Sequence, residues 1–193
     1  MHLGNIFTAL LAWLSVRSQK GKMILRIEDL DPQRSKPEFI RALREDLLWL
    51  GLDWDGEMPL QSSRSELYAR YFSKLPVYPC YCSRNELHDA SAPHASDGRL
   101  IYAGTCRNLS ERERLEKSRS PAWRVKVPER TVTFQDGVFG DYTEHLDKDC
   151  GDFILRRSDG VYAYQLAVVC DDALGGVTEV VVDQITGVTF SGR

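Results

Sequence analysis

The sequence lacks any segment suited to crossing a membrane or to export through one. It contains no run of about 18 apolar residues, which is the length that a transmembrane helix needs. The apolar stretch near the start has no basic leader before it and no small-residue cleavage pattern after it, so it differs from a signal peptide. We therefore expect a cytoplasmic protein with no membrane partner.

The sequence also lacks a strong excess of one charge, and its number of cysteines is odd. The formal net charge is −3, so the composition neither supports nor excludes RNA binding, and any such contact needs local basic groups. Five cysteines without a secretion signal favour thiols or metal ligands over a disulfide framework. The 193 residues, 42% of them hydrophobic, allow one sizeable core and a small second lobe.

The first third of the chain has the alternating pattern of an α/β protein. An apolar run over residues 6–14 predicts a helix that is buried on most of its sides. Residues 23–27 are apolar and are followed by acids, which predicts a buried parallel strand. Ser35 and Ser63 each begin a capping-box pattern, which predicts two further helices, the first of them ending at Gly51.

The rest of the chain has shorter elements. Residues 78–107 form short polar segments with three of the five cysteines, which indicates an inserted lobe. Ser110 begins a third capping box, in front of a charged helix. Apolar or alternating segments predict four strands, over residues 122–127, 131–134, 153–156 and 162–169. The last of these strands would run into Asp171 and Asp172.

Two segments of the first third carry residues suited to binding charged ligands. His2, Gly4 and Asn5 stand at the start of the first helix, where N–H groups and the positive end of the helix dipole can bind phosphate. The alternative is a polar helix cap. Glu28 follows the first predicted strand, at the end of the sheet where α/β proteins bind ligands. Alternatively, Glu28 pairs with Arg26 or caps the loop.

The predicted lobe carries a possible metal site. Cys80, Cys82 and Cys106 offer three soft ligands for zinc, and a fourth protein ligand would make the site structural. His88 and His94 lie in the same loop and are chemically good candidates for that fourth ligand. The alternative is three unrelated buried thiols. Two cysteines match no ligand spacing and are expected to pack or to face solvent, Cys150 and Cys170.

Taken together, these segments resemble the catalytic domain of the glutamyl-tRNA synthetases and, more narrowly, the glutamyl-Q tRNA(Asp) synthetase family. The matching motifs are residues 2–5 (His-Leu-Gly-Asn), 26–31 (Arg-Ile-Glu-Asp-Leu-Asp), 50–56, 61–62, the cysteines 80 and 82 with Tyr102 and Cys106, and 162–172. The resemblance covers residues 2–181. It implies an α/β fold, with an incomplete Rossmann-like parallel sheet of the class I synthetase type and a small inserted zinc-binding lobe.

The resemblance also implies a reaction, in which glutamate is activated by ATP with Mg²⁺ and transferred to the queuosine base of tRNA(Asp). Activation needs cationic and N–H groups around the phosphates and little acid–base chemistry from the protein. His2 would be catalytic and would bind ATP together with Gly4 and Asn5, while Glu28 and Tyr164 would bind the glutamate. Tyr102 would be the fourth zinc ligand, an uncommon choice because a free phenol has a pKa of about 10.

The resemblance divides the chain into four segments. They are residues 1–77, the first part of a catalytic domain whose first strand is missing; 78–120, the zinc-binding insertion; 121–181, the remainder of the catalytic domain; and 182–193, a tail that matches nothing in the family. We expect a monomer.

Three departures from the family pattern predict low activity. The strand expected before His2 is absent, Val182 and Asp183 stand where the family has an arginine followed by Gly-Ala-Asp, and no lysine-containing loop follows. Valine cannot replace an arginine that clamps a carboxylate, because losing such a contact typically costs a few kcal/mol. We therefore expect a truncated form that is inactive or weakly active.

Two other functions are compatible with the motifs. One is the catalytic part of an ordinary glutamyl-tRNA synthetase, although the spacing of Tyr102 and Cys106 favours the glutamyl-Q form. The other is a non-catalytic, zinc-stabilised binding fragment. Exchange of pyrophosphate into ATP that depends on glutamate distinguishes an enzyme from such a fragment.

Overall fold

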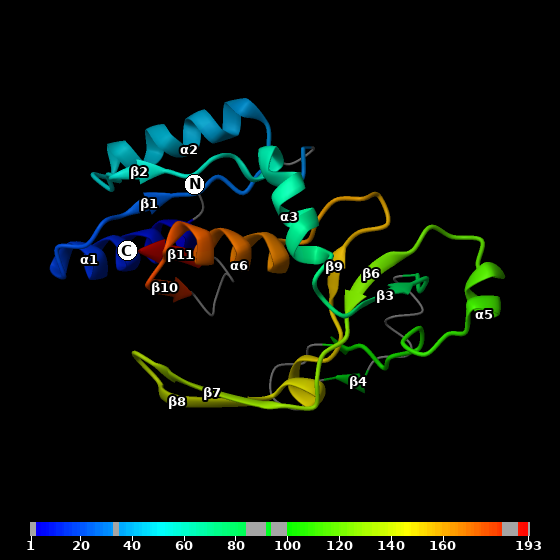
Figure 1. The fold of residues 1–193 in the computed structure, drawn as a ribbon. Helices are drawn as coiled ribbons and strands as arrows, with labels where there is room; N and C mark the ends of the chain where they lie inside the picture. Colours follow the sequence, from blue (N-terminus) through cyan, green and yellow to red (C-terminus); the bar gives the residue numbers. More distant parts are fainter. Residues whose placement is uncertain (1–2, 33–34, 84–91, 94–99, 183–188, 193) are drawn as a thin grey trace. The chain divides into compact units, whose positions relative to one another are not determined.

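The structure is a computed structural model that describes residues 3–32, 35–83, 92–93, 100–182 and 189–192. The chain divides into two compact units (Figure 1). The first unit consists of Met1–Arg70 with Tyr164–Arg193, and the second consists of Tyr71–Ala163. Among the described residues, no helix is both long enough and apolar enough to span a membrane.

The first unit combines helices with a short pair of parallel strands. Its elements are α1 (Leu3–Ser18), β1 (Ile24–Leu25), α2 (Pro37–Trp49), β2 (Gly56–Glu57), the short 3-10 helix η1 (Gln61–Arg64), α3 (Ser65–Phe72), α6 (Tyr164–Gly175), β10 (Glu179–Val182) and β11 (Thr189–Gly192). β1 and β2 run parallel, with Ile24 opposite Gly56, whereas β10 and β11 are antiparallel. The predicted α/β class with a parallel sheet is therefore confirmed.

Small side chains on α1 face the core of the first unit. Ala9 and Ala12 are buried together with Thr8 and Val16, at spacings of three and four residues that form one stripe along the helix. This core is completed by residues of β1, α2 and the loops that follow them, including Leu25, Ile27, Leu47 and Leu52.

The prediction that the first helix is buried on most of its sides is wrong. Only the stripe of small residues packs inward, and the larger apolar side chains lie on the rest of the helix surface. Five of them are each at least 39% exposed, Leu3, Phe7, Leu10, Leu11 and Leu14. The apolar composition of the helix therefore overstated how much of it is covered by the described residues.

Two of the three predicted capping boxes do not form. α2 has Lys36 rather than Ser35 at its N-cap, and no side chain caps the helix. Ser63 lies inside η1, where its hydroxyl donates a hydrogen bond to the Leu60 carbonyl at 2.7 Å. A serine hydroxyl can bond to a nearby turn instead of capping a helix, and the sequence pattern alone does not separate the two uses.

The second unit is mainly antiparallel. Its elements are β3 (Val77–Cys80), β4 (Ala92–Pro93), β5 (Leu100–Ile101), α5 (Glu111–Leu115), β6 (Ala122–Val125), β7 (Thr131–Asp136), β8 (Gly140–His145), the π-helical turn η2 (Leu146–Cys150) and β9 (Ile154–Arg156). β6 lies between β3 and β9, and β7 and β8 form a hairpin. The predicted strands near residues 122, 131 and 153 are confirmed, as is the capping box of Ser110 and Glu113.

The strand predicted over residues 162–169 is wrong, because most of this segment belongs to α6. Tyr162 makes only an isolated bridge to Arg156. Within α6, residues 167, 170 and 171 lie on one side of the helix and are buried, and the neighbouring Leu166 and Val168 are buried as well. A short apolar run fits a helix as well as a strand, and the sequence pattern alone did not separate the two.

Candidate functional site

A cavity in the first unit brings together two of the predicted site residues. It has a volume of about 380 Å³ and is lined by residues of α1, β1, α2 and the loops around them. Most of the lining is apolar, but Asn5, Arg26 and Glu28 also line it. Cavities of this size and composition, with a few polar groups, are typical of small-molecule sites.

The other predicted ligand-binding residues have different positions. Gly4 lies beside Asn5 in the first turn of α1, at the helix end that favours anions. His2 lies outside the described residues. Tyr164 begins α6, is 42% exposed and is not among the described residues that line the cavity. Asn5 and Glu28 are thus brought to one cavity, and Tyr164 is not.

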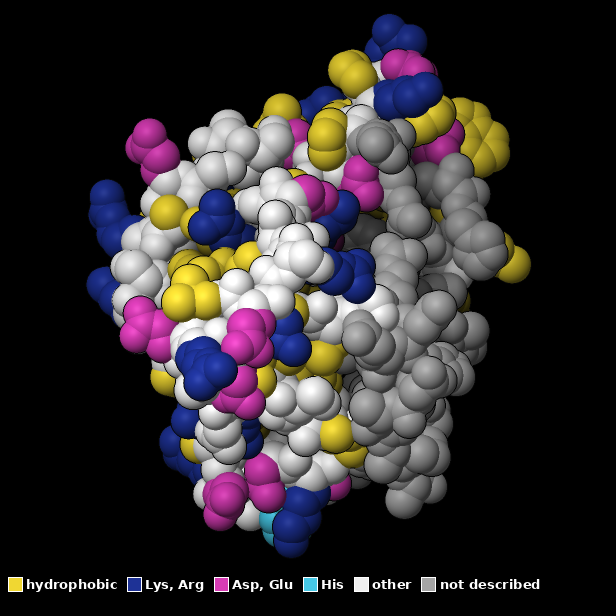
Figure 2. Space-filling model, turned by 90° about the vertical axis from the view of Figure 1, so that its right-hand side faces the viewer, with side chains coloured by type: hydrophobic (Ala, Val, Ile, Leu, Met, Phe, Trp, Pro, Cys, Tyr) yellow, Lys and Arg dark blue, Asp and Glu magenta, His cyan; other side chains and the backbone are white. Residues whose placement is uncertain are grey.

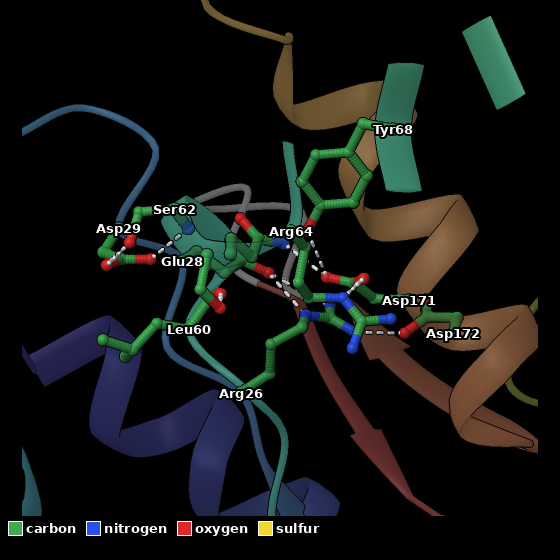
Figure 3. Close-up of polar contacts among 11 residues, drawn as sticks. Arg26, Glu28, Asp29, Leu60, Ser62, Arg64, Tyr68, Asp171 and Asp172 are labelled. Carbon is green, nitrogen blue, oxygen red and sulfur yellow. Dashed lines mark hydrogen bonds and ion pairs between the residues drawn. The ribbon is translucent and has the colours of Figure 1, made fainter. Parts of the chain in front are cut away.

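Glu28 is held by Arg26 at the end of β1 (Figure 3). The Nε and Nη2 atoms of Arg26 donate hydrogen bonds to Oε1 of Glu28 at 3.2 and 3.0 Å, and Nη1 forms an ion pair with Asp172 of α6. The expected alternative, a pair between Glu28 and Arg26, is therefore observed. Burial raises the pKa of Glu28 above its usual range, although Arg26 acts in the opposite direction. A further cation beside Glu28 would stabilise its charged form.

The neighbouring carboxylate of Asp171 is the centre of a buried polar cluster. Its Oδ2 accepts hydrogen bonds from Gln61 Nε2 and from the Tyr68 hydroxyl, both at 3.0 Å. Its Oδ1 forms an ion pair with Nε of Arg64 at 2.9 Å. We call these four residues the Asp171 cluster. Burial and the bond to Asp171 raise the pKa of Tyr68, so its hydroxyl remains a donor.

Three motifs of the sequence meet around this cluster. Asp29, next to Glu28, accepts hydrogen bonds from the Ser62 backbone N–H at 2.9 Å and from the Ser62 hydroxyl. Residues 26–31, 61–62 and 171–172 are therefore tied together by polar contacts (Figure 3). No sequence motif predicted Arg64 or Tyr68 as part of this cluster, although residues 61, 64 and 68 have the spacing of one helical face.

The three cysteines of the predicted metal site converge in the second unit. The Sγ atoms of Cys80, Cys82 and Cys106 all lie within 4.8 Å of one another, and those of Cys82 and Cys106 are 3.6 Å apart. The Tyr102 hydroxyl lies 3.6 Å from Cys80 Sγ and 3.7 Å from Cys82 Sγ. A tetrahedral zinc site with Zn–S bonds of about 2.3 Å needs S–S separations of about 3.8 Å. These four side chains therefore fit a zinc ion.

The thiols of this cluster differ in their surroundings. Burial raises the pKa of the Cys82 thiol to about 12. Burial also acts to raise the pKa of Cys80, but the contact with the Tyr102 hydroxyl and the hydrogen bond from Arg124 outweigh it and lower that pKa. Burial and the contact with Cys80 raise the pKa of Tyr102.

The other histidines and cysteines singled out in the sequence lie outside the described residues or outside the thiol cluster. His88 and His94, the alternative fourth ligands, lie outside the described residues. No disulfide links the five cysteines, all of which lie in the described part of the chain; Cys150 is exposed and Cys170 is buried in α6, as expected. On the face shown in Figure 2, acidic and basic side chains are interspersed over the described surface, in keeping with the small net charge.

Comparison with known proteins identifies relatives over nearly the whole chain. Residues 1–184 match the family described as tRNA synthetases class I (E and Q), catalytic domain. A Glutamyl-Q tRNA(Asp) synthetase of Nitratidesulfovibrio vulgaris is 49% identical over 94% of this chain. A protein of the same name from Deinococcus radiodurans is 48% identical over 93% of it. The chain spans 61% of the length of each of these relatives.

A solved structure has a similar fold. The Glutamate-tRNA Synthetase from Elizabethkingia anophelis superimposes with a TM-score of 0.73 at 28% sequence identity. The match covers 92% of this chain and 41% of that one. The same α/β arrangement is thus found in a protein named for glutamate and tRNA.

We predict that Asp171→Asn lowers the free energy of unfolding by about 2–4 kcal/mol, because it leaves Arg64 without its counter-ion and sets an amide N–H against buried donors. Urea unfolding measures the change. The control is Glu45→Gln on α2 of the same unit, which removes an exposed ion pair and should cost less than about 1 kcal/mol. Equal losses in the two variants would contradict the role of the Asp171 cluster.

Proposed function

We propose, given that the chain belongs to the class I tRNA synthetases of the glutamate and glutamine (E and Q) type, that it carries the catalytic part of a glutamyl-Q tRNA(Asp) synthetase. Such an enzyme would activate glutamate with ATP and Mg²⁺ and would transfer it to the queuosine base of tRNA(Asp). The names of two relatives that are 48% and 49% identical support this choice of substrates over those of an ordinary glutamyl-tRNA synthetase.

The observation that carries the proposal is the cavity shared by Asn5 and Glu28. An amino acid that reacts with ATP needs an anion for its ammonium group and an anion-binding helix end for the phosphates. Glu28 would supply the first of these groups, and the start of α1 would supply the second. Because both lie on one cavity, the reacting groups of the two substrates could meet there.

Each of these residues would have a distinct role in the activation of glutamate. The glutamate carboxylate would attack the α-phosphorus of ATP, so that a carboxyl–phosphate bond forms as pyrophosphate leaves. His2, Gly4 and Asn5 would bind the phosphates. Glu28 has one oxygen bonded to Arg26, and its other oxygen, which bonds to no residue that the structure describes, would accept the ammonium. A role of Tyr164 in binding the glutamate has only the family resemblance to support it, because Tyr164 is not among the described residues that line this cavity.

We expect this activity to be weak in the 193-residue chain. Val182 of β10 stands where the family resemblance implies an arginine that holds the side-chain carboxylate of glutamate. Without that bidentate contact the substrate keeps one charge poorly satisfied. The assay must therefore be sensitive enough to detect slow transfer.

We predict that radioactive glutamate is transferred, slowly, to tRNA(Asp) that contains queuosine and to no other tRNA. The assay compares this tRNA with the same tRNA(Asp) carrying guanine in place of queuosine and with tRNA(Glu). Charging of tRNA(Glu) would contradict the proposed acceptor and support an ordinary glutamyl-tRNA synthetase. No transfer to any of the three would favour the non-catalytic binding fragment.

We also propose that Cys80, Cys82, Tyr102 and Cys106 hold a structural zinc ion. The separations of their sulfur and oxygen atoms support this assignment, as does the soft donor set. A zinc ion closed by four protein ligands would bind no substrate and would instead join β3 to the segment around residue 106. Its contribution would be to stabilise the second unit.

We predict about one equivalent of zinc in the protein purified without chelators, measured by atomic emission. Cys106→Ser should lose most of the zinc because it removes one of the four ligands. Cys150→Ser, which changes an exposed thiol outside the cluster, should keep it. Less than half an equivalent in the unmodified protein, or equal zinc in the two variants, would contradict the metal site.

A further inference from the structure

We propose that Arg124 is a positioning residue of the metal site, in that its guanidinium group orients the Cys80 sulfur and the Tyr102 ring and balances the negative charge of the bound ligands. The inference rests on the zinc site proposed above. It concerns a residue outside the ligand set, which no ligand-spacing pattern in the sequence indicates.

The pairing of two strands brings Arg124 to the site. In the antiparallel pair of β3 and β6, Tyr78 lies opposite Arg124 and Cys80 lies opposite Ala122. Residues directly opposite one another, and those two apart along a strand, point to the same face of a sheet. Arg124 and Cys80 therefore share a face, and Arg124 is only 6% exposed.

The guanidinium group makes three different contacts. Its Nε donates a hydrogen bond to Cys80 Sγ at 3.3 Å. Its central carbon lies 3.9 Å from the centre of the Tyr102 ring, which is a close cation–π contact. Its Nη1 donates to the Asp152 carbonyl at 2.7 Å and so anchors the group to the backbone. Arg124 thus touches two of the four proposed zinc ligands at once.

Among the residues that the structure describes, no carboxylate forms an ion pair with Arg124. The nearby Asp152 carboxylate accepts instead from the Tyr78 hydroxyl at 2.6 Å and from the Val127 N–H at 2.8 Å. A buried cation without a counter-ion is costly. A zinc ion with three thiolates and a phenolate carries net negative charge, and would supply the missing counter-charge.

The contacts also require an arginine rather than any cation. A planar guanidinium group can stack on a ring and donate sideways to a sulfur at the same time, whereas the ammonium group of lysine is a point charge on a flexible chain. Partners that orient metal ligands typically change metal affinity by about 10–100-fold when they are removed. We expect an effect of that size from Arg124.

The experiment compares zinc affinity in Arg124→Met, Arg124→Lys and the unmodified protein, by competition with a chromophoric chelator. Lys126→Met is the matched control, because it removes an exposed positive charge two residues along the chain. Arg124→Met should weaken zinc binding at least about tenfold, and Arg124→Lys by a smaller but measurable factor. Lys126→Met should bind zinc as the unmodified protein does.

Cobalt spectra of the same proteins show whether the ligands move. In Arg124→Lys the sulfur-to-cobalt absorption bands should shift, because the Cys80 sulfur is no longer oriented. If Arg124→Met does not fold, Arg124→Lys decides the question. Zinc affinity within twofold of the unmodified protein, with an unchanged cobalt spectrum, would overturn the role of Arg124. Absence of zinc from the unmodified protein would instead overturn the metal site itself.

Discussion

A buried carboxylate determines how the first unit is assembled. Asp171 is 1% exposed, and a charge at such a depth is stable only with donors around it. Those donors come from η1 and α3, so α6 must pack against both of them. The next residue of α6, Asp172, then pairs with Arg26, which in turn holds Glu28 at the cavity. The orientation of Glu28, the residue proposed to bind the amino acid, thus depends on the burial of Asp171.

The second unit also contains a buried charge that needs partners, but this charge is positive. Arg124 is a buried cation whose guanidinium group contacts the Cys80 sulfur, the Tyr102 ring and the Asp152 carbonyl. In each unit, an arginine donates hydrogen bonds to a proposed ligand-binding group, Glu28 in the first unit and Cys80 in the second. Such bonds are stronger and more directional than neutral ones, which explains how short strands of two to four residues can position them.

The sequence correctly predicted the elements and sites that depend on residues close together in the chain. It failed for those that depend on contacts with distant residues. A local apolar run predicted β1, a capping box predicted α5, and cysteine spacing predicted the thiol cluster. α6 was mispredicted because a short apolar run fits a helix as well as a strand, and the contact of Asp171 with Gln61, 110 residues away in the chain, cannot be seen from neighbouring residues. Arg124 was missed because an alternating pattern predicts a half-exposed strand and not what covers each of its faces. The exposed side of α1 was missed because an apolar run does not show which of its residues another element covers.

The most direct test of the account is the affinity for glutamate, measured by calorimetry in the presence of ATP and Mg²⁺. If Glu28 receives the ammonium group, Glu28→Gln should weaken glutamate binding by about tenfold or more, because a charge-assisted hydrogen bond is lost. Glu45→Gln, an exposed change on α2, should leave the affinity unaltered. Equal glutamate affinity in Glu28→Gln and the unmodified protein would contradict the proposal that the cavity beside α1 binds the amino acid through Glu28.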